Sequence, residues 1–305
     1  MRIASIDIGT NTFRILVGEI RDKEIKKLYI NRVITRLGGG FSKEGKITED
    51  AAKRSLSALK KFAKIIERYK VKRVRAVATS VVRESQNGSK FLEQVKKETG
   101  IKTEVISGEE EAQLTVNGVL KSVSVDTKYS VIFDVGGGST EYVFVKKGQV
   151  LGLTSTNLGI VYLTERYLKA DIPSSSDIKK LSKEIEKVLS VKLCWIPTVL
   201  PSKLTLIGTA GTPTTLAAIQ LGLKKYDPDL VNGFILKHDM LTSTFESLIR
   251  IPPRDRLKIP ALEKGREDVI IPGALIVLKT MDRFSKDSVL VSDGGLLEGV
   301  AYSLL

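Results

Sequence analysis

Short apolar runs and one long amphipathic stretch alternate over the first part of the chain. Apolar side chains fill residues 3–8 except at Ser5 and Asp7, which is typical of a buried strand. From Glu49 to Tyr69 they recur every three or four positions, the period of a helix with one buried face. In chain order we predict strands at 3–8, 13–17 and 25–35, a helix at 49–69, a strand at 73–78, a helix at 89–99, a strand at 103–106 and a helix from Ser107. This order is βββαβαβα.

The same order starts again near Tyr129. The predicted elements are strands at 129–134, 141–146 and 149–156, helices at 161–168 and 177–191, a strand at 204–207, a helix at 214–221, a helix at 268–283 interrupted by Pro272, a strand at 288–291 and a last helix. Asp7 and Asp134 end equivalent strands 127 residues apart, and each precedes an apolar residue, a glycine and small polar residues. The pattern predicts a degenerate internal duplication.

The duplication predicts an α/β fold of two domains, residues 1–122 and 123–305, with the last helix free to pack back on the first domain. A length of 305 residues agrees with about two domains of ordinary size. Two domains that face each other would place both Asp–Gly turns across one cleft.

Composition restricts the chemistry that these domains can perform. The chain holds 49 Lys and Arg against 35 Asp and Glu, a formal charge of +14, with one Cys and one His. These counts exclude an intramolecular disulfide and any two-histidine zinc or catalytic site. Carboxylates, hydroxyls, backbone amides, Lys, Arg or a metal held by oxygen remain. The positive charge has three readings: a polyanionic ligand, a solvated surface, or a bias of the source organism.

The sequence contains no run of about 18 apolar residues, so we expect no membrane span. Asp7 interrupts the apolar stretch that a signal peptide would need. We therefore expect a cytoplasmic protein.

Two glycine-rich turns are the first candidate site. Glycine lets a phosphate approach backbone N–H groups because it has no Cβ, and a strand-end Asp offers Mg²⁺ a hard oxygen ligand. One such turn alone is more often a tight hairpin, and the pairing of two reverses that preference. The candidate phosphate-binding residues are Gly9, Thr10, Asn11 and Thr12, and Gly136, Gly137, Gly138 and Ser139, with Asp7 and Asp134 as candidate metal ligands.

Three adjacent carboxylates, Glu109–Glu111, follow Ser107 at a predicted helix start. Ser107 with Glu110 predicts a capping box, and from the residues alone we prefer capping to catalysis. The alternative is that one carboxylate faces the cleft as a general base for water. Arg83, just beyond a strand end, is either a phosphate clamp or a surface partner of Glu84.

A third strand-to-helix turn carries Gly208, Thr209 and Gly211. It is either an anion nest at a helix N-terminus or a simple helix-entry turn. His238 has no second histidine to work with, and we expect it to be structural.

Seven segments together resemble the exopolyphosphatase / guanosine pentaphosphate phosphohydrolase family of the actin-like ATPase superfamily. They follow the family's order, cover nearly the whole chain, and lie at residues 7–13, 78–83, 107–112, 134–141, 157–159, 208–212 and 292–296. The resemblance implies two actin-like, ribonuclease H-like domains with a cleft between them. It also implies Mg²⁺-dependent hydrolysis of terminal phosphates from inorganic polyphosphate, or of the 5′-γ-phosphate of guanosine pentaphosphate.

The resemblance also assigns roles to single residues. Glu111 matches the proposed base, Arg83 a phosphate contact, and Asp134 and Glu141 the acids associated with the metal. This overturns the preference for capping, and Glu110 stays beside Glu111 as a candidate catalytic residue. K⁺ is a candidate activator.

Leu297 stands where many relatives have Arg, and the chain resembles the short, two-domain form of the family. Two rival functions are a kinase of the same superfamily and a non-catalytic sensor of phosphate chains. The choice between polyphosphate and guanosine pentaphosphate stays open. The oligomeric state is open too, with a homodimer among the options, and no membrane or specific nucleic-acid partner is expected.

Overall fold

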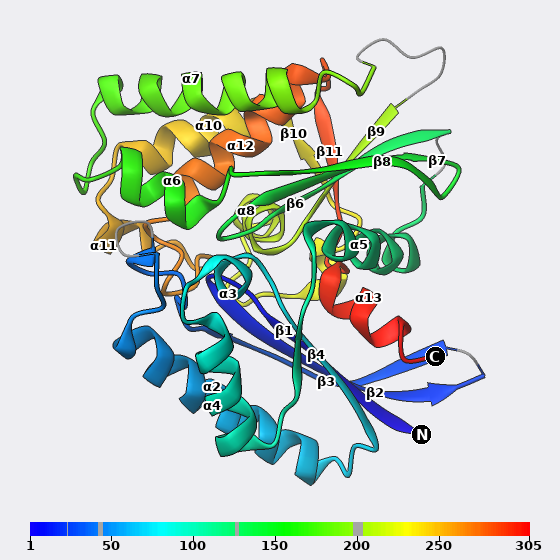
Figure 1. Ribbon diagram of the computed structural model, residues 1–305. Helices are drawn as coiled ribbons and strands as arrows, with labels where there is room; N and C mark the ends of the chain where they lie inside the picture. The colour runs from blue at the N-terminus through cyan, green and yellow to red at the C-terminus, as the bar shows by residue number, and fades with distance from the viewer. Residues whose placement is uncertain (23, 42–44, 126–127, 198–203) are drawn as a thin grey trace. The chain divides into compact units, whose positions relative to one another are not determined.

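The computed structural model describes residues 1–22, 24–41, 45–125, 128–197 and 204–305. The chain forms two compact units, Met1–Gly118 with Gly295–Leu305, and Val119–Gly294. Helices and strands alternate in both, so the predicted α/β class is confirmed (Figure 1). The division between the units falls inside α5 (Gly108–Ser122), close to the predicted boundary. Over the described ranges, no helix is both long and apolar enough to cross a membrane.

The first unit is built on a five-stranded mixed sheet with the order β3-β2-β1-β4-β5. β1 pairs antiparallel with β2 and parallel with β4, and β4 pairs parallel with β5, so the carboxyl ends of β1, β4 and β5 share one edge. Its elements are β1 (Arg2–Ile8), β2 (Thr12–Arg21), β3 (Glu24–Ile34), α2 (Glu49–Arg68), β4 (Arg73–Ala78), α3 (Ser80–Glu84), α4 (Gly88–Thr99), β5 (Thr103–Val105), α5 and α13 (Leu296–Tyr302).

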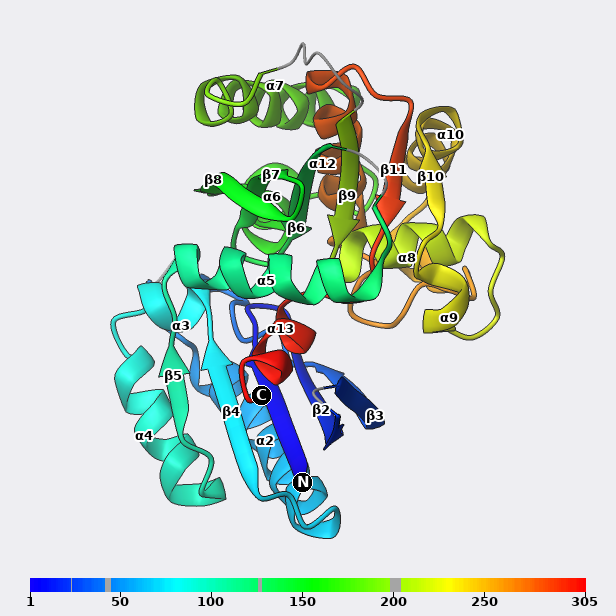
Figure 2. The same ribbon diagram turned by 90° about the vertical axis from the view of Figure 1, so that its right-hand side faces the viewer.

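Helices cover both faces of this sheet (Figure 2). On one face α2 packs Phe62 into the core that contains Ile6. On the other face α13 packs Leu297 against Ile3, and Ser5 Oγ donates a hydrogen bond to the Leu297 carbonyl at 2.9 Å. Because successive side chains of β1 point to opposite faces, both of which are covered, the strand is apolar along most of its length.

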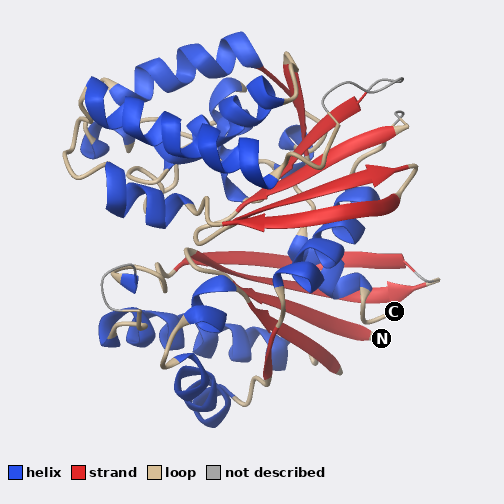
Figure 3. Ribbon diagram, turned by 45° about the horizontal axis from the view of Figure 1, so that its top comes forward, coloured by secondary structure: helices blue, strands red, loops and turns tan. Residues whose placement is uncertain are grey.

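The second unit is built on a six-stranded mixed sheet with the order β10-β11-β9-β6-β7-β8. Its elements are β6 (Tyr129–Val135), β7 (Thr140–Lys146), β8 (Gln149–Thr156), α6 (Ile160–Tyr167), α7 (Ser175–Lys192), β9 (Leu204–Thr209), α8 (Gly211–Gln220), α9 (Pro228–Val231), β10 (Ile235–Lys237), α10 (His238–Ile249), α11 (Pro253–Arg256), α12 (Ile270–Arg283) and β11 (Ser288–Val291). α12 is buried over most of its length and packs against α6, α7, α8 and α10. Figure 3 shows these helices gathered on one side of the strands.

Two details of the predicted second half are wrong. The predicted helix at 268–283 is not interrupted at Pro272: α12 begins at Ile270, so Pro272 lies in its first turn, where a missing N–H costs no helical hydrogen bond. The short strand β10, which was not predicted, adds an antiparallel edge to the sheet.

The two sheets repeat one plan. The order β8-β7-β6-β9-β11 in the second unit corresponds to β3-β2-β1-β4-β5 in the first, with β10 added at the edge. The pairing register shifts between Val17 and Gly18 in the first sheet and between Phe144 and Val145 in the second. These shifts are 127 residues apart, as are Asp7 and Asp134, so the duplication extends to an irregularity of the strands.

Candidate active site

The β1–β2 turn of the first unit is closed by its own backbone. The Gly9 N–H donates to the Thr12 carbonyl at 3.2 Å, and a Cβ on Gly9 would lie 2.8 Å from that same oxygen. A side chain there would force the two strands apart, so the turn requires glycine. The turn lies at the carboxyl end of β1, the edge at which open α/β sheets place ligands.

Asp7, the candidate metal ligand of this unit, is buried and already has a cationic partner. Arg14 stands opposite it on β2 and contacts Asp7 Oδ2 through Nε at 2.9 Å and Nη2 at 2.8 Å. A fork of two charge-assisted contacts neutralises the carboxylate. Asp7 is therefore a weaker candidate metal ligand than the sequence predicted, because Arg14 offsets its negative charge.

The turn is joined to the next strand end by hydroxyl groups. Thr10 Oγ1 and Ser80 Oγ lie 2.8 Å apart, and Ser80 begins α3 directly after β4. Asn11 is 5% exposed, and neither its Nδ2 nor its Oδ1 has a hydrogen-bond partner among the described residues. A buried amide without a partner is costly, and at a ligand-facing turn it is a donor and acceptor available to a substrate.

The structure brings Arg83 and Glu111 together within the first unit. Arg83 Nη1 donates to the Ile106 carbonyl at 2.8 Å and lies 3.4 Å from Glu111 Oε2. Glu111 is 8% exposed, and Arg83 also reaches Glu84 at 4.0 Å, the surface pair that was the alternative. The guanidinium is thus held by a backbone carbonyl beside a buried carboxylate, and α3 connects it to the Gly9–Thr12 turn.

Glu110 points to a different partner. Ser107 Oγ accepts the Glu110 N–H at 3.1 Å, as a helix cap requires, whereas the Glu110 carboxylate accepts from Arg75 Nη2 at 2.7 Å. The Ser107 half of the predicted capping box is therefore present. The Glu110 carboxylate, which was predicted to complete the box, binds Arg75 instead. The cap and the buried acid belong to different residues, so Glu111 does not serve the cap.

In the second unit, the β6–β7 turn repeats the first. The Gly136 N–H donates to the Ser139 carbonyl at 2.9 Å, and a Cβ on Gly136 would lie 2.9 Å from that oxygen. The N-terminus of α6 packs on the turn, since Ile160 N donates to Gly136 O at 3.1 Å. Gly159 precedes that helix because a Cβ there would overlap the Gly138 backbone.

Asp134 and Glu141 stand directly opposite each other on β6 and β7, and Thr209 is the register partner of Asp134 on β9. Opposite residues of an antiparallel pair share one face with Cβ atoms about 5 Å apart. Asp134 is 9% and Glu141 2% exposed, and Glu141 Oε1 accepts from Ser155 Oγ at 2.9 Å. Two adjacent buried carboxylates fit a hard divalent cation, which takes one or two carboxylates and fills its other positions with phosphate oxygens and water.

The third predicted turn joins β9 to α8. It is contacted by Arg266, a residue that the sequence analysis did not identify. Thr209 Oγ1 donates to Gly294 O at 2.8 Å, and Ala210 has the left-handed φ of 67°. The Arg266 guanidinium packs on Gly211 so closely that a Cβ there would overlap it. Arg266 is 6% exposed. Its approach to Gly211 depends on tertiary contacts across more than 50 residues, and no local signal in the sequence marks it.

Asp293 is a second residue without an assigned role at this edge of the second unit. Its Oδ1 accepts from the Tyr226 hydroxyl and its N–H donates to Asn232 Oδ1 at 3.0 Å. It follows β11, whose carboxyl end lies beside that of β9. The motif was recognised in the sequence, but the two partners come from distant segments.

The structure thus assembles the predicted residues in two sets. Gly9–Thr12, Arg83 and Glu111 lie at the strand ends of the first unit, and Asp134, Glu141, Gly136–Ser139 and Gly208–Gly211 at those of the second. The predicted cleft between the two turns stays a prediction. Within the described residues, no group of three or more His, Cys, Asp and Glu side chains could hold a metal by itself.

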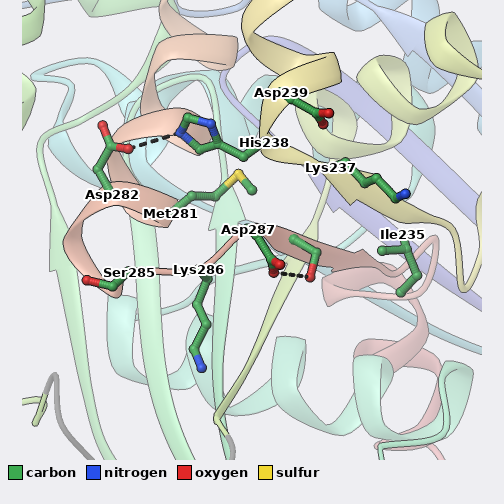
Figure 4. A pocket seen from close by; sticks show the side chains of 10 residues that line it. Ile235, Lys237, His238, Asp239, Met281, Asp282, Ser285, Lys286 and Asp287 are labelled. Atoms are coloured by element: carbon green, nitrogen blue, oxygen red, sulfur yellow. Dashed lines mark hydrogen bonds and ion pairs between the residues drawn. The ribbon is translucent and has the colours of Figure 1, made fainter.

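A separate hollow of about 730 Å³ in the second unit contains none of these residues (Figure 4). It lies between β10 and the end of α12, where His238 Nε2 and Asp282 Oδ1 are 3.0 Å apart. Lys237 and Lys286 also line it. His238 therefore lies outside both sets of candidate residues, and its structural role stays a prediction.

The comparisons with known proteins point to one phosphatase family. The model of the Ppx/GppA phosphatase family matches residues 16–305. Exopolyphosphatase 2 of Mycobacterium tuberculosis is 31% identical over an alignment of 316 positions, which covers 99% of this chain and 98% of that protein. A protein of Photobacterium profundum named guanosine-5′-triphosphate,3′-diphosphate pyrophosphatase is 27% identical over 99% of this chain and 59% of its own length. The chain is also 32% identical, over 97% of its length, to a bifunctional 3-dehydroquinate synthase/phosphatase of Fusobacterium nucleatum, of which it spans 46%.

Solved structures agree with the sequence matches. The Aquifex aeolicus member of the Ppx/GppA family has a TM-score of 0.83 at 37% identity, covering 100% of this chain and 97% of that one. An exopolyphosphatase from Cytophaga hutchinsonii has a TM-score of 0.90 at 31% identity over the same shares of the two chains.

Proposed function

Because the chain belongs to the Ppx/GppA phosphatase family, whose members hydrolyse phosphoanhydride bonds, we propose that it is an exopolyphosphatase that removes the terminal phosphate of inorganic polyphosphate. The observation that carries the proposal is the contact between Arg83 and the buried Glu111 at a strand edge of the first unit. A cation that can hold a phosphate beside a carboxylate that can accept a proton is what hydrolysis of a phosphoanhydride needs.

The reaction proceeds by attack of water on the terminal phosphorus. The water oxygen forms a bond to phosphorus, the anhydride P–O bond breaks, and the shortened chain leaves with that bridging oxygen. Glu111 orients the water and accepts its proton, while Arg83 and the backbone amides of the Gly9–Thr12 and Gly136–Ser139 turns hold the phosphate oxygens.

Asp134 and Glu141 are the residues that would hold Mg²⁺, with Asp7 less suited because Arg14 already neutralises it. Bound there, Mg²⁺ supplies positive charge that offsets the charge of the phosphate oxygens. K⁺ stays a candidate activator, and a cytoplasmic location and a homodimer stay predictions. The formal charge of +14 agrees with a polyanionic substrate.

The second candidate substrate is guanosine pentaphosphate, which the name of the Photobacterium relative favours. Its 5′-triphosphate ends in the same anhydride, so the same residues would act on it. The rival functions differ in their products: a kinase would need a hydroxyl acceptor, and a sensor would bind the chain without releasing phosphate.

The test measures phosphate release from polyphosphate and from guanosine pentaphosphate side by side, with Mg²⁺ and with or without K⁺. We expect Glu111→Gln to lower kcat by about a thousandfold while polyphosphate binding is retained, because the variant loses only the proton acceptor. Glu109→Gln is the matched control, since Glu109 is an exposed acid two residues away on the same helix. Near-normal turnover of Glu111→Gln would remove Glu111 from this role, and absence of phosphate release by the wild type would overturn the proposal.

A further inference from the structure

The segment that carries Arg266 has little regular structure of its own. Between α10 and α12 the chain forms only the four-residue helix α11 and a series of turns. Its backbone hydrogen bonds are local, such as Arg266 N to Glu263 O at 3.0 Å and Ile270 N to Arg266 O at 3.0 Å. A segment of this kind needs contacts from side chains to hold one conformation.

Arg256 supplies such contacts from the end of α11. It is 2% exposed, and its guanidinium donates to three backbone carbonyls: Leu248 O at 2.9 Å, Glu267 O at 2.7 Å and Asp171 O at 3.2 Å. These acceptors belong to the end of α10, to Glu267, which directly follows Arg266, and to the loop before α7. The planar guanidinium fixes all three in one geometry, which a lysine cannot do.

This arrangement carries an energetic cost that packing alone would not require. Burial lowers the pKa of Arg256, because the charged form loses its hydration. An apolar side chain of similar volume would fill the same space without that cost. The carbonyls are therefore the reason for an arginine at this position, and the shortest of the three contacts is the one to Glu267.

The contact between Arg256 and the Glu267 carbonyl lies next to Arg266 in the chain. The Arg266 guanidinium lies against Gly211 in the β9–α8 turn, and its Nε lies 3.7 Å from Glu263 Oε2. The Glu267 carbonyl belongs to the peptide between Glu267 and Asp268, directly beyond the residue that follows Arg266. A shift of that peptide displaces the adjoining backbone of Arg266 and moves the guanidinium away from the turn.

We infer that Arg256 is a positioning residue for Arg266: it holds the carbonyl of Glu267, the residue after Arg266, and so keeps the Arg266 guanidinium on the Gly211 turn. The inference rests on the proposed function in one respect, that the Gly208–Gly211 turn contacts the phosphate chain. Arg256 itself is buried among carbonyls and does not touch substrate.

A double-mutant cycle in the full chain tests this coupling. We expect Arg256→Lys to raise the KM for polyphosphate by about tenfold with kcat within about twofold, because a misplaced Arg266 weakens binding. In the Arg266→Met background the same substitution should change KM by less than about twofold. Arg254→Lys is the matched control on the same short helix, since its side chain is 86% exposed, and it should leave both constants unchanged. Equal effects of Arg256→Lys with and without Arg266 would overturn the inference.

A second measurement needs no activity. In the ¹⁵N NMR spectrum, Arg256→Lys should shift the Arg266 Nε–H signal and speed its exchange with solvent, because the guanidinium leaves the Gly211 turn, whereas Arg254→Lys should leave that signal unchanged. A folded Arg256→Lys protein whose Arg266 signal matches that of the wild type would overturn the inference. If the wild type releases no phosphate, the proposed function fails while this measurement still decides the coupling.

Discussion

The two glycine turns share a backbone hydrogen bond but differ in the charge of the side chains beside them. In each, the glycine N–H donates to the carbonyl three residues later, and an aspartate two residues before the glycine is the penultimate residue of the central strand. Opposite Asp7 stands Arg14, and at the equivalent position opposite Asp134 stands Glu141. One pair is neutral, and the other carries two carboxylates in a buried environment.

The difference shows that the two copies of the duplicated fold provide different chemical groups at equivalent positions. A turn whose aspartate is neutralised has little attraction for a cation, whereas two adjacent carboxylates offer a cation two hard oxygen ligands. The first unit instead provides Arg83 and Glu111, which suit phosphate and proton chemistry. The second unit is therefore the better candidate for the metal, and the first for the base.

The largest expected effect separates the two aspartates. We expect Asp134→Asn to lower kcat about a hundredfold and to shift the Mg²⁺ dependence to higher concentration, because the metal loses a ligand. Asp7→Asn should cost about tenfold or less, since Arg14 already neutralises this carboxylate. Phosphate release measured over a Mg²⁺ titration gives both values.

Thermal unfolding with and without Mg²⁺ provides the control. Asp134→Asn should reduce the rise in Tm that Mg²⁺ gives the wild type, because the metal loses a ligand, whereas Asp7→Asn leaves Arg14 without that carboxylate and should lower the Tm in both conditions. Equal losses of activity, or an unchanged Mg²⁺ dependence in Asp134→Asn, would break the assignment of the metal to the second unit.

The second prediction concerns what the turns share. Gly9→Ala and Gly136→Ala each place a Cβ within 2.8 and 2.9 Å of a backbone oxygen of the same turn. We expect each to lower the free energy of unfolding by about 2 kcal/mol, because backbone must move to relieve the contact. Urea unfolding followed by circular dichroism measures both. A substitution tolerated in one turn only would show that the two backbones are not equivalent.

The strand and helix pattern could be predicted because the central strands and the long helices bury apolar faces that set a period in the sequence. β10 was missed because three residues with one buried side chain carry no period. Asp7, Asp134 and the glycine turns were visible as motifs. The pairing of Asp7 with Arg14 was not predicted, although strand register decides it. Arg256 and Arg266 could not be found, because their partners are carbonyls and a glycine that are distant in sequence.

The smallest expected effect concerns Asn11, whose equivalent in the second turn is Gly138. The Asn11 amide is buried and lacks partners among the described residues, so the folded protein bears the cost of its desolvation. Asn11→Leu has similar volume and should raise the free energy of unfolding by about 1 kcal/mol. The same change removes a donor at the turn and should raise the KM for polyphosphate about fivefold. Ser55→Ala removes a different buried polar group without a partner among the described residues, a hydroxyl on α2, and should affect stability without changing KM. A gain in stability with an unchanged KM would mean that the amide faces no substrate, and that the two turns differ here only in packing.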